Sequence, residues 1–287
     1  MSTMQFGVNV RAVAGRQGFL QFVRRADELG YDVLAAPDHL GALSPFVALA
    51  AVAALTERLR LRTYVLNVGF WNPALLAREV ATLDMLSDGR VELGLGAGHM
   101  RSEHDDAGLP WLGFDERVER LEGMAREMRR RLDARVPMLI GAMSRHGLAV
   151  AARHADIVGF AGLRQVTGAP PGTFTLSSSA ETAERVEQVR RQAGDRPYRS
   201  DILLQMVVIG REPQDAAAEV ALATPGLTVE QILDSPFALF GRDAGHAAEE
   251  LRRRQQVYGV DGVTTHQPSM EALGEVMAAY RREAGPR

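Results

Sequence analysis

The sequence predicts an α/β protein, and within that class a closed (β/α)8 TIM barrel. Short apolar runs rich in β-branched residues alternate with longer segments of helical period, which is the pattern of βα units that build a parallel sheet. Eight such pairs can be counted, and 287 residues is a length that one barrel routinely fills. We therefore expect a single barrel domain over residues 1–287 rather than an open, doubly wound sheet.

The elements follow in order along the chain. The expected strands are Met4–Val10, Asp32–Pro37, Arg60–Leu66, Val91–Gly96, Val136–Gly141, Asp156–Phe160, Ile202–Ile209 and Gly262–His266. The expected helices are Gly18–Gly30, Pro45–Thr56, Pro73–Ser87, Asp115–Leu132, Arg145–His154, Ala180–Gly194, a longer helical region Glu212–Tyr258, and Ser269–Arg282. Gly30 suits a helix C-cap, and Pro45 and Pro73 suit first helical turns. The segment Gly162–Ser179 has turn composition and predicts either a loop over a site or a plain crossover.

The composition excludes several classes of function. The 33 basic residues against 36 acidic ones give a formal net charge of −3, so no positive field draws the chain to nucleic acid or anionic lipid. A small-molecule partner is expected instead. The absence of Cys excludes thiolate metal sites and a cysteine nucleophile, and the absence of Lys excludes Schiff-base chemistry. No apolar run matches a membrane span and no signal peptide is visible, so a cytoplasmic location is expected.

Candidate site residues follow the strands, because the active site of a barrel lies at the carboxyl ends of its strands. Asp38 and His39 follow the second expected strand, His99 follows the fourth, and His266 ends the eighth. Three histidines are thereby expected at one mouth. The third and fifth strands end in Val65–Gly69 and Ile140–Arg145.

Glycines 94, 96 and 98 precede His99. A dinucleotide-binding fingerprint would require glycine at position 99, so the spacing argues against that fold. Glycine also permits close approach of the backbone to a flat ligand, and it equally permits a tight turn without any ligand. Both interpretations stay open at this point.

The segment from His99 to Asp106 is dense in histidine and carboxylate. Its two histidines are five residues apart, not the four that would place them on one helical face, and charge-dense loops are usually solvated. The first strand carries no His-x-His pair, and no G-x-S-x-G elbow is present. No metal site is therefore expected, and a metal-dependent or serine hydrolase is disfavoured.

Several motifs together carry a family resemblance. They are Gly30–Leu40, Val65–Glu79, Thr82–Gly98, Arg117–Glu122, Ala151–Val158 and Tyr258–Val263. In these segments, and over nearly its whole length, the chain resembles the luciferase-like flavin oxidoreductases. It is most similar to their actinobacterial branch of probable coenzyme F420-dependent oxidoreductases.

The resemblance implies roles for residues at the mouth. His39 would lie beside the deazaflavin ring as the first general acid or base, Asp38 would orient it, and His99 would be the second candidate. A non-proline cis peptide that supports the ring would fall near Tyr64 and Val65. The remaining residues implied to bind cofactor around the ring are Asn67, Gly96, Ala97 and Gly98.

The resemblance also implies a phosphate site. Ala142, Met143, Ser144 and Arg145 match the turn whose N–H groups receive the coenzyme phosphate, although Met143 stands where the family usually has a further glycine. Because the chain has no Lys, Arg145 and Arg164 are the candidate basic contacts to the anion.

The function implied is hydride transfer between C5 of coenzyme F420 and a small organic substrate. One alternative is an FMN-dependent monooxygenase that uses reduced flavin and oxygen, and another is a non-catalytic flavin-binding partner subunit. Apolar helices at Ala48–Leu55 and Leu75–Leu86 predict a homodimer, unless both helices simply pack on the barrel.

Overall fold

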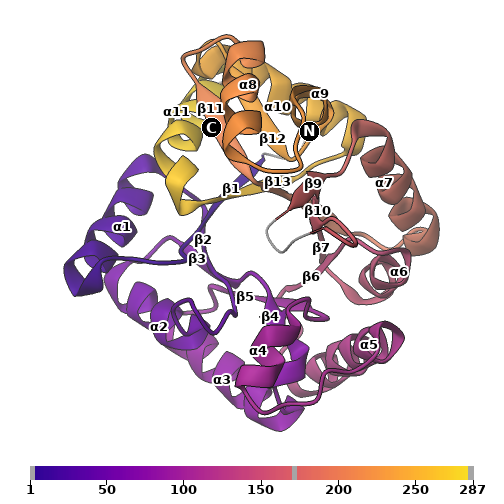
Figure 1. Ribbon diagram of the computed structural model, residues 1–287. Helices are drawn as coiled ribbons and strands as arrows, with labels where there is room; N and C mark the ends of the chain where they lie inside the picture. The colour runs from indigo at the N-terminus through magenta and orange to yellow at the C-terminus, as the bar shows by residue number, and fades with distance from the viewer. Residues whose placement is uncertain (1–3, 170–172, 284–287) are drawn as a thin grey trace.

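The computed structural model describes residues 4–169 and 173–283. Eight parallel strands close into a barrel, and helices cover its outside (Figure 1). Around the barrel the strands are β1 (Gln5–Asn9), β2 (Val33–Ala36), β3 (Arg60–Thr63), β5 (Val91–Gly96), β6 (Met138–Ala142), β7 (Ile157–Phe160), β10 (Arg199–Leu204) and β13 (Gly262–His266), which pairs with β1 again. The predicted α/β class and closed barrel are confirmed.

The helices predicted between the strands are also present. They are α1 (Gly15–Leu29), α2 (Pro45–Leu55), α3 (Pro73–Leu86), α5 (Phe114–Arg131), α6 (Arg145–His154), α7 (Ser179–Ala193), α10 (Ala244–Tyr258) and α11 (Met270–Glu283). Gly30 closes α1 with a φ of 87°, a left-handed conformation that glycine adopts without strain. Asn72 caps α3 through its side chain, with Pro73 in the first turn. None of the helices described is long and apolar enough to cross a membrane.

The region after the seventh strand differs from the prediction. The expected strand Ile202–Ile209 is two strands, β10 and β11 (Met206–Ile209), and β11 leaves the barrel to pair with β12 (Ala238–Gly241). The expected helical region Glu212–Tyr258 therefore holds α8 (Pro213–Ala223), α9 (Val229–Asp234) and β12 before α10. The strand β12 was not predicted because the sequence on both sides of it has a helical period. Its own four residues are too few to show the period of a strand.

Three shorter features lie at the carboxyl ends of the strands. The segment Gly162–Ser179 contains an antiparallel pair, β8 (Leu163–Gln165) and β9 (Phe174–Leu176), while Pro170 and Pro171 fall outside the described residues. After β3, the chain continues through β4 (Leu66–Asn67) and the 3-10 turn η1 (Val68–Phe70). After β5 comes the short helix α4 (Arg101–Asp106), where sequence analysis expected a solvated loop.

A buried network of charged side chains lies inside the barrel. Arg62 on β3 has no exposed surface, and its guanidinium donates to Glu92 Oε2 at 2.7 Å and to Asp201 Oδ2 at 2.9 Å. It also donates to Gln5 Oε1 at 2.9 Å, and Tyr64 donates its hydroxyl proton to Asp201 Oδ1 at 2.6 Å. Every charge in this network meets an opposite charge, which offsets the cost of removing it from water.

Candidate active site

His39 is held by Glu103 at the barrel mouth. His39 Nδ1 lies 2.9 Å from Glu103 Oε1, and the same oxygen accepts from the backbone N–H of Leu40 at 3.2 Å. An ionised carboxylate only accepts, so His39 Nδ1 carries the proton and donates it to Glu103. The other ring nitrogen, Nε2, is then the atom free to accept a proton.

Glu103 is a residue of the candidate site that was not foreseen from the sequence. It lies on α4 in a segment expected to be solvated, yet only 8% of its surface is exposed. The helix α4 delivers it to His39, which precedes it by 64 positions in the sequence. A carboxylate within a charge-dense segment carries no signal of its own in the sequence, because its burial depends on a distant partner.

The hydrogen bonds of Asp38 go to residues other than His39, which it was expected to orient. Asp38 Oδ2 accepts from the indole N–H of Trp71 at 2.8 Å and from the backbone N–H of Asn67 at 3.1 Å. Burial raises the pKa of the Asp38 carboxyl, while these two hydrogen bonds act in the opposite direction. Asp38 therefore ties the end of β2 to β4 and to the turn that follows η1.

His99 lies next to His39. The two rings meet edge to face, with centroids 5.4 Å apart and planes at 90°. Partial desolvation at the mouth lowers the pKa of His99, although the residue is exposed at the surface, and the nearby imidazole of His39 lowers it further. Burial likewise lowers the pKa of His266 at the end of β13, with the charge of Arg11 as a second cause. The predicted meeting of histidines at the mouth is thus present for His39 and His99.

The peptide bond between Tyr64 and Val65 is cis, as predicted. It separates β3 from β4, and the Tyr64 hydroxyl donates to Asp201 of the buried charged network. The side chain of Val65 lies against the next strands: a Cβ placed on Gly96 would fall 2.6 Å from Val65 Cγ2. Gly96 thereby has a structural reason, which is to admit the Val65 side chain, whereas a Cβ on Gly94 would collide with the backbone carbonyl of Thr63.

Asn67 and Gly98 form the next contact around the mouth. A Cβ on Gly98 would fall 2.4 Å from Asn67 Oδ1, and the φ of 78° at Gly98 also favours glycine. Asn67 Nδ2 lies 3.0 Å from His104 Nε2, and His104 Nδ1 lies 3.1 Å from the carbonyl oxygen of Pro110. This pattern requires a neutral His104 with its proton on Nδ1. Ala97 lies between Gly96 and Gly98 and is partly exposed to the mouth.

The turn after β6 leads into α6. Ser144 caps the helix by accepting from the N–H of Gly147 at 3.1 Å, which leaves other first-turn N–H groups free for an anion. Arg145 is exposed and pairs with no carboxylate among the described residues, while Met143 is partly exposed in the turn. Arg164, the other predicted phosphate contact, is instead paired with Glu181 at 2.7 Å.

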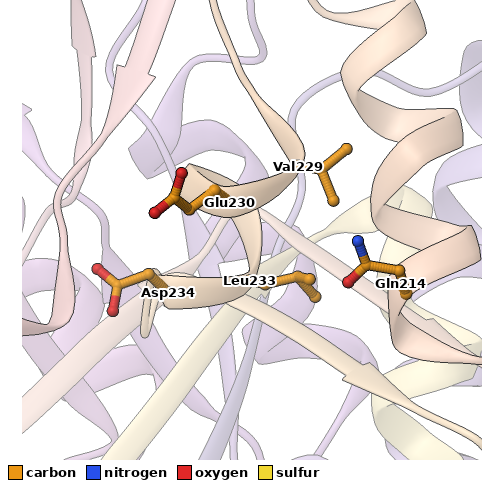
Figure 2. A pocket seen from close by; sticks show the side chains of 5 residues that line it. All are labelled: Gln214, Val229, Glu230, Leu233 and Asp234. Carbon is orange, nitrogen blue, oxygen red and sulfur yellow. The ribbon is translucent and has the colours of Figure 1, made fainter.

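A separate hollow lies between two of the outer helices. It has a volume of about 560 Å³ between α8 and α9 and is lined by Gln214, Val229, Glu230, Leu233 and Asp234 (Figure 2). Asp234 is already engaged there, because it accepts hydrogen bonds from Ser179. No residue of the mouth contributes to this hollow. Within the described ranges, no three His, Asp or Glu side chains are grouped so as to hold a metal ion.

Residues 4–279 match the family model described as luciferase-like monooxygenase. An F420-dependent glucose-6-phosphate dehydrogenase of Amycolatopsis mediterranei is 36% identical over 116 residues, which is 37% of this chain and 35% of the relative. An FMNH2-dependent dimethylsulfone monooxygenase of Pseudomonas putida is 37% identical over 79 residues, covering 28% of this chain and 22% of the relative. The chain thus matches about a third or less of the length of these relatives.

Solved structures resemble the whole chain. An F420-dependent secondary alcohol dehydrogenase in complex with an F420-acetone adduct has a TM-score of 0.75 and 16% identity, covering 97% of this chain and 99% of the other. The monooxygenase RslO1 from Streptomyces bottropensis has a TM-score of 0.71 and 20% identity, covering 97% and 98%. At these identities the likeness supports the fold.

Proposed function

The chain belongs to the luciferase-like monooxygenase family, and we propose that it is a coenzyme F420-dependent oxidoreductase that exchanges a hydride with a small organic substrate. The observation that carries this proposal is the pair of His39 and Glu103 at the barrel mouth, where barrel enzymes place their chemistry. The sequence match to an F420-dependent dehydrogenase favours F420 as the cofactor.

The residues at the mouth fit a cofactor with a flat ring and a phosphate. The first turn of α6 and the unpaired Arg145 suit the phosphate, which both F420 and FMN carry. The backbone of Gly96, Ala97 and Gly98 and the side chain of Val65 would lie along the ring. When bound, the deazaflavin ring supplies the hydride chemistry at C5, and the protein supplies position and proton handling.

His39 is the proton-handling group in this proposal. Oxidation of an alcohol releases a hydride and a proton, and reduction of a carbonyl takes up both. Nε2 of His39 accepts the proton in one direction and returns it in the other, while Glu103 stabilises the imidazolium formed in between. The lowered pKa of His99 favours its neutral form, which adds no competing positive charge beside His39. His39 is the catalytic residue and Glu103 its positioning residue.

The first test is a titration of the purified protein with F420, FMN and the phosphate-free deazaflavin riboside, followed by cofactor fluorescence. We expect F420 to bind and FMN to bind far more weakly. Arg145→Gln is expected to weaken F420 binding by about 10- to 100-fold without changing the affinity for the riboside, because a charge-assisted contact to phosphate is lost. Binding of neither cofactor, or an equal loss for the riboside, would contradict this assignment.

FMN-dependent oxygen chemistry is the second candidate, and the match to an FMNH2-dependent monooxygenase favours it. Two results would together establish this chemistry over F420-dependent hydride transfer. The protein would bind FMN in preference to F420 in the titration, and it would consume oxygen only when reduced flavin is supplied. A flavin-binding subunit without catalysis would bind cofactor and turn over no substrate, and substitution of His39 would then change nothing measurable.

We propose that the molecule forms a homodimer through α2 and α3. All 11 residues of α2 are apolar, although a helix that is apolar on every side is normally buried on every side. Here Val47 is 72% exposed and Leu55 45%, and on the adjacent α3 Leu75 is 51% and Met85 70% exposed. A second copy of the chain, presenting the same face, would cover them.

Light scattering would test the dimer. The wild-type chain is expected at twice its mass of 31.2 kDa, and Val47→Glu is expected at the mass of one chain, because a charge would be buried without a partner. Leu222→Glu is the matched control, since Leu222 is 90% exposed on α8, away from α2 and α3. A monomeric wild type, or equal dissociation by both variants, would refute the interface.

A further inference from the structure

The short helix α4 has no apolar side with which to pack. Its six residues, Arg101–Asp106, are all polar or charged, and no side chain caps its first turn. A helix this short is not stable in water by itself, and most helices in proteins are held by an apolar face. Only Glu103 and His104 of α4 are buried, with 8% and 3% of their surfaces exposed. The position of α4 at the mouth therefore depends on these two polar side chains.

The two buried side chains of α4 contact different elements. Glu103 accepts a hydrogen bond from His39, which follows β2. His104 contacts β4 and η1 instead: its Nε2 lies 3.0 Å from Asn67 Nδ2, and a Cβ placed on Gly69 would fall 2.5 Å from its Cε1. Because Glu103 and His104 are adjacent in the sequence, the contact that His104 makes limits where the Glu103 carboxylate can lie.

Both ring nitrogens of His104 form hydrogen bonds. Asn67 Oδ1 accepts from the backbone N–H of Gly69 at 3.0 Å, which leaves Asn67 Nδ2 to donate to His104 Nε2. His104 Nδ1 then carries the proton and donates it to the carbonyl oxygen of Pro110 at 3.1 Å. The imidazole thus joins α4 to β4 through one nitrogen, and to the chain that leaves α4 through the other.

Aromatic side chains surround the imidazole of His104. The ring centroids of Phe70 and of Trp111 each lie 5.1 Å from its own. The guanidinium of Arg117 lies over Trp111 in turn, with its Cζ 3.8 Å from the ring centroid. A phenyl ring at position 104 could make the same aromatic contacts. Packing alone therefore does not require histidine, and what histidine adds is its two hydrogen bonds.

We propose that His104 is a positioning residue of the active site, whose hydrogen bond from Asn67 holds α4 so that the carboxylate of Glu103 meets His39 Nδ1. The inference rests on the proposed function, in which His39 transfers the proton and Glu103 stabilises its charged form. The effect of His104 on the reaction passes through Glu103. When the bond from Asn67 is lost, α4 is no longer fixed to β4, and the Glu103 carboxylate leaves His39.

Three variants separate the contacts of His104. His104→Phe keeps an aromatic ring and loses both hydrogen bonds, His104→Gln can place an acceptor near the position of Nε2, and His104→Asn can place a donor near that of Nδ1. We expect His104→Phe to lower kcat by about 10- to 100-fold, because a small displacement of a positioning group is costly in rate. His104→Asn should lower kcat nearly as much, and His104→Gln should retain most of it. The opposite order of these two would overturn the proposal.

Tyr31→Phe is the matched control for stability. Tyr31 has no exposed surface, and its hydroxyl donates to the carbonyl oxygen of Met270 at 2.7 Å, so this variant also loses a buried hydrogen bond. Neither residue belongs to α4 or to the contacts of α4 described above, and kcat is expected to stay unchanged. Urea unfolding gives the stability that each variant loses. A fall in kcat that follows lost stability equally in Tyr31→Phe and His104→Phe would overturn the proposal.

A double-variant cycle tests whether His104 acts through Glu103. In the Glu103→Ala background, His104→Phe is expected to cause no further fall in kcat, because the carboxylate that α4 positions is already absent. In the wild-type background, the loss from His104→Phe should be no larger than that from Glu103→Ala. Losses that multiply in the double variant would refute a role through Glu103.

The contact between His39 and Glu103 can also be followed without cofactor or substrate. A ring N–H bonded to a carboxylate is a strong, charge-assisted hydrogen bond, and NMR of the protein with isotope-labelled histidine detects its proton far downfield. We expect the His39 resonance in the wild type and in His104→Gln, and its loss in His104→Phe and Glu103→Ala. Its persistence in His104→Phe would overturn the proposal. A wild type that shows the resonance but turns over no substrate would refute the proposed function, and the comparison of variants would still decide the role of His104.

Discussion

Replacing His39 with Gln is expected to lower kcat by about 10²- to 10⁴-fold while leaving F420 affinity unchanged, because the proton step loses its acid and base. Glutamine can still donate to Glu103, so the helix α4 keeps its contact with the mouth. Added imidazole is expected to restore part of the rate, since it can occupy the space of the missing ring. The measurement is steady-state turnover with and without imidazole, alongside the cofactor titration.

Glu103→Gln distinguishes a positioning residue from a catalytic one. It is expected to lower kcat less than His39→Gln does, and added imidazole is not expected to rescue it, because the ring is present but no longer supported by a charge. The chain offers a matched control in His154, which pairs with Glu122 at the same 2.9 Å on the outer helices α5 and α6. His154→Gln should leave kcat unchanged. Full activity of His39→Gln would refute the assignment.

Replacing Arg62 with Met is expected to destabilise the fold by about 3–5 kcal/mol at neutral pH, because Glu92 and Asp201 would remain buried without their shared cation. Arg60 also pairs with Glu92, at 2.6 Å, but its side chain is 31% exposed. Arg60→Met is therefore the control, with an expected loss of about 1 kcal/mol or less. Urea unfolding of the three proteins gives the comparison, and equal losses for both variants would contradict the role of burial.

The same network predicts how stability depends on pH. Burial alone would raise the pKa of Glu92, but the positive charges of Arg62, Arg60 and Arg199 together outweigh it and hold this pKa at about 2, below the ordinary 4.5. The stability that Glu92 contributes is therefore complete above about pH 4.5 and is lost as the pH falls toward 2. In Arg62→Met the buried carboxylates gain by protonation, so its deficit relative to wild type should shrink on acidification. A deficit that stays constant from pH 7 to pH 4 would contradict this reasoning.

The parts of the fold that could be predicted are those that a local pattern specifies. The strand Val91–Gly96 and the helix Arg145–His154 match the structure residue for residue, because each has a clear period between turn residues. The strand β12 could not be predicted, since its four residues pair only with β11, which lies about thirty residues earlier. Its identity as a strand depends on that partner.

The candidate site divides in the same way. His39 could be found from its position after a strand, and the cis peptide at Tyr64 and Val65 from the family resemblance. The partner of His39 could not be found in this way. The neighbouring Asp38 is the obvious candidate along the chain, but its carboxylate accepts a hydrogen bond from Trp71 instead. The path of α4 across the mouth brings Glu103, rather than Asp38, to His39. No spacing in the sequence predicts that path.

The side chain of Val65 occupies the room left by the missing Cβ atoms of Gly96 and Gly141, which belong to two different strands. Substitutions at these three positions therefore depend on one another. Alanine at Gly96 cannot be accepted while Val65 keeps its full size, whereas a smaller residue at 65 would open the way for it. In evolution, a smaller residue at position 65 must therefore come before a larger one at position 96. Homologues that differ from this chain at one of the three positions should carry a compensating difference at another.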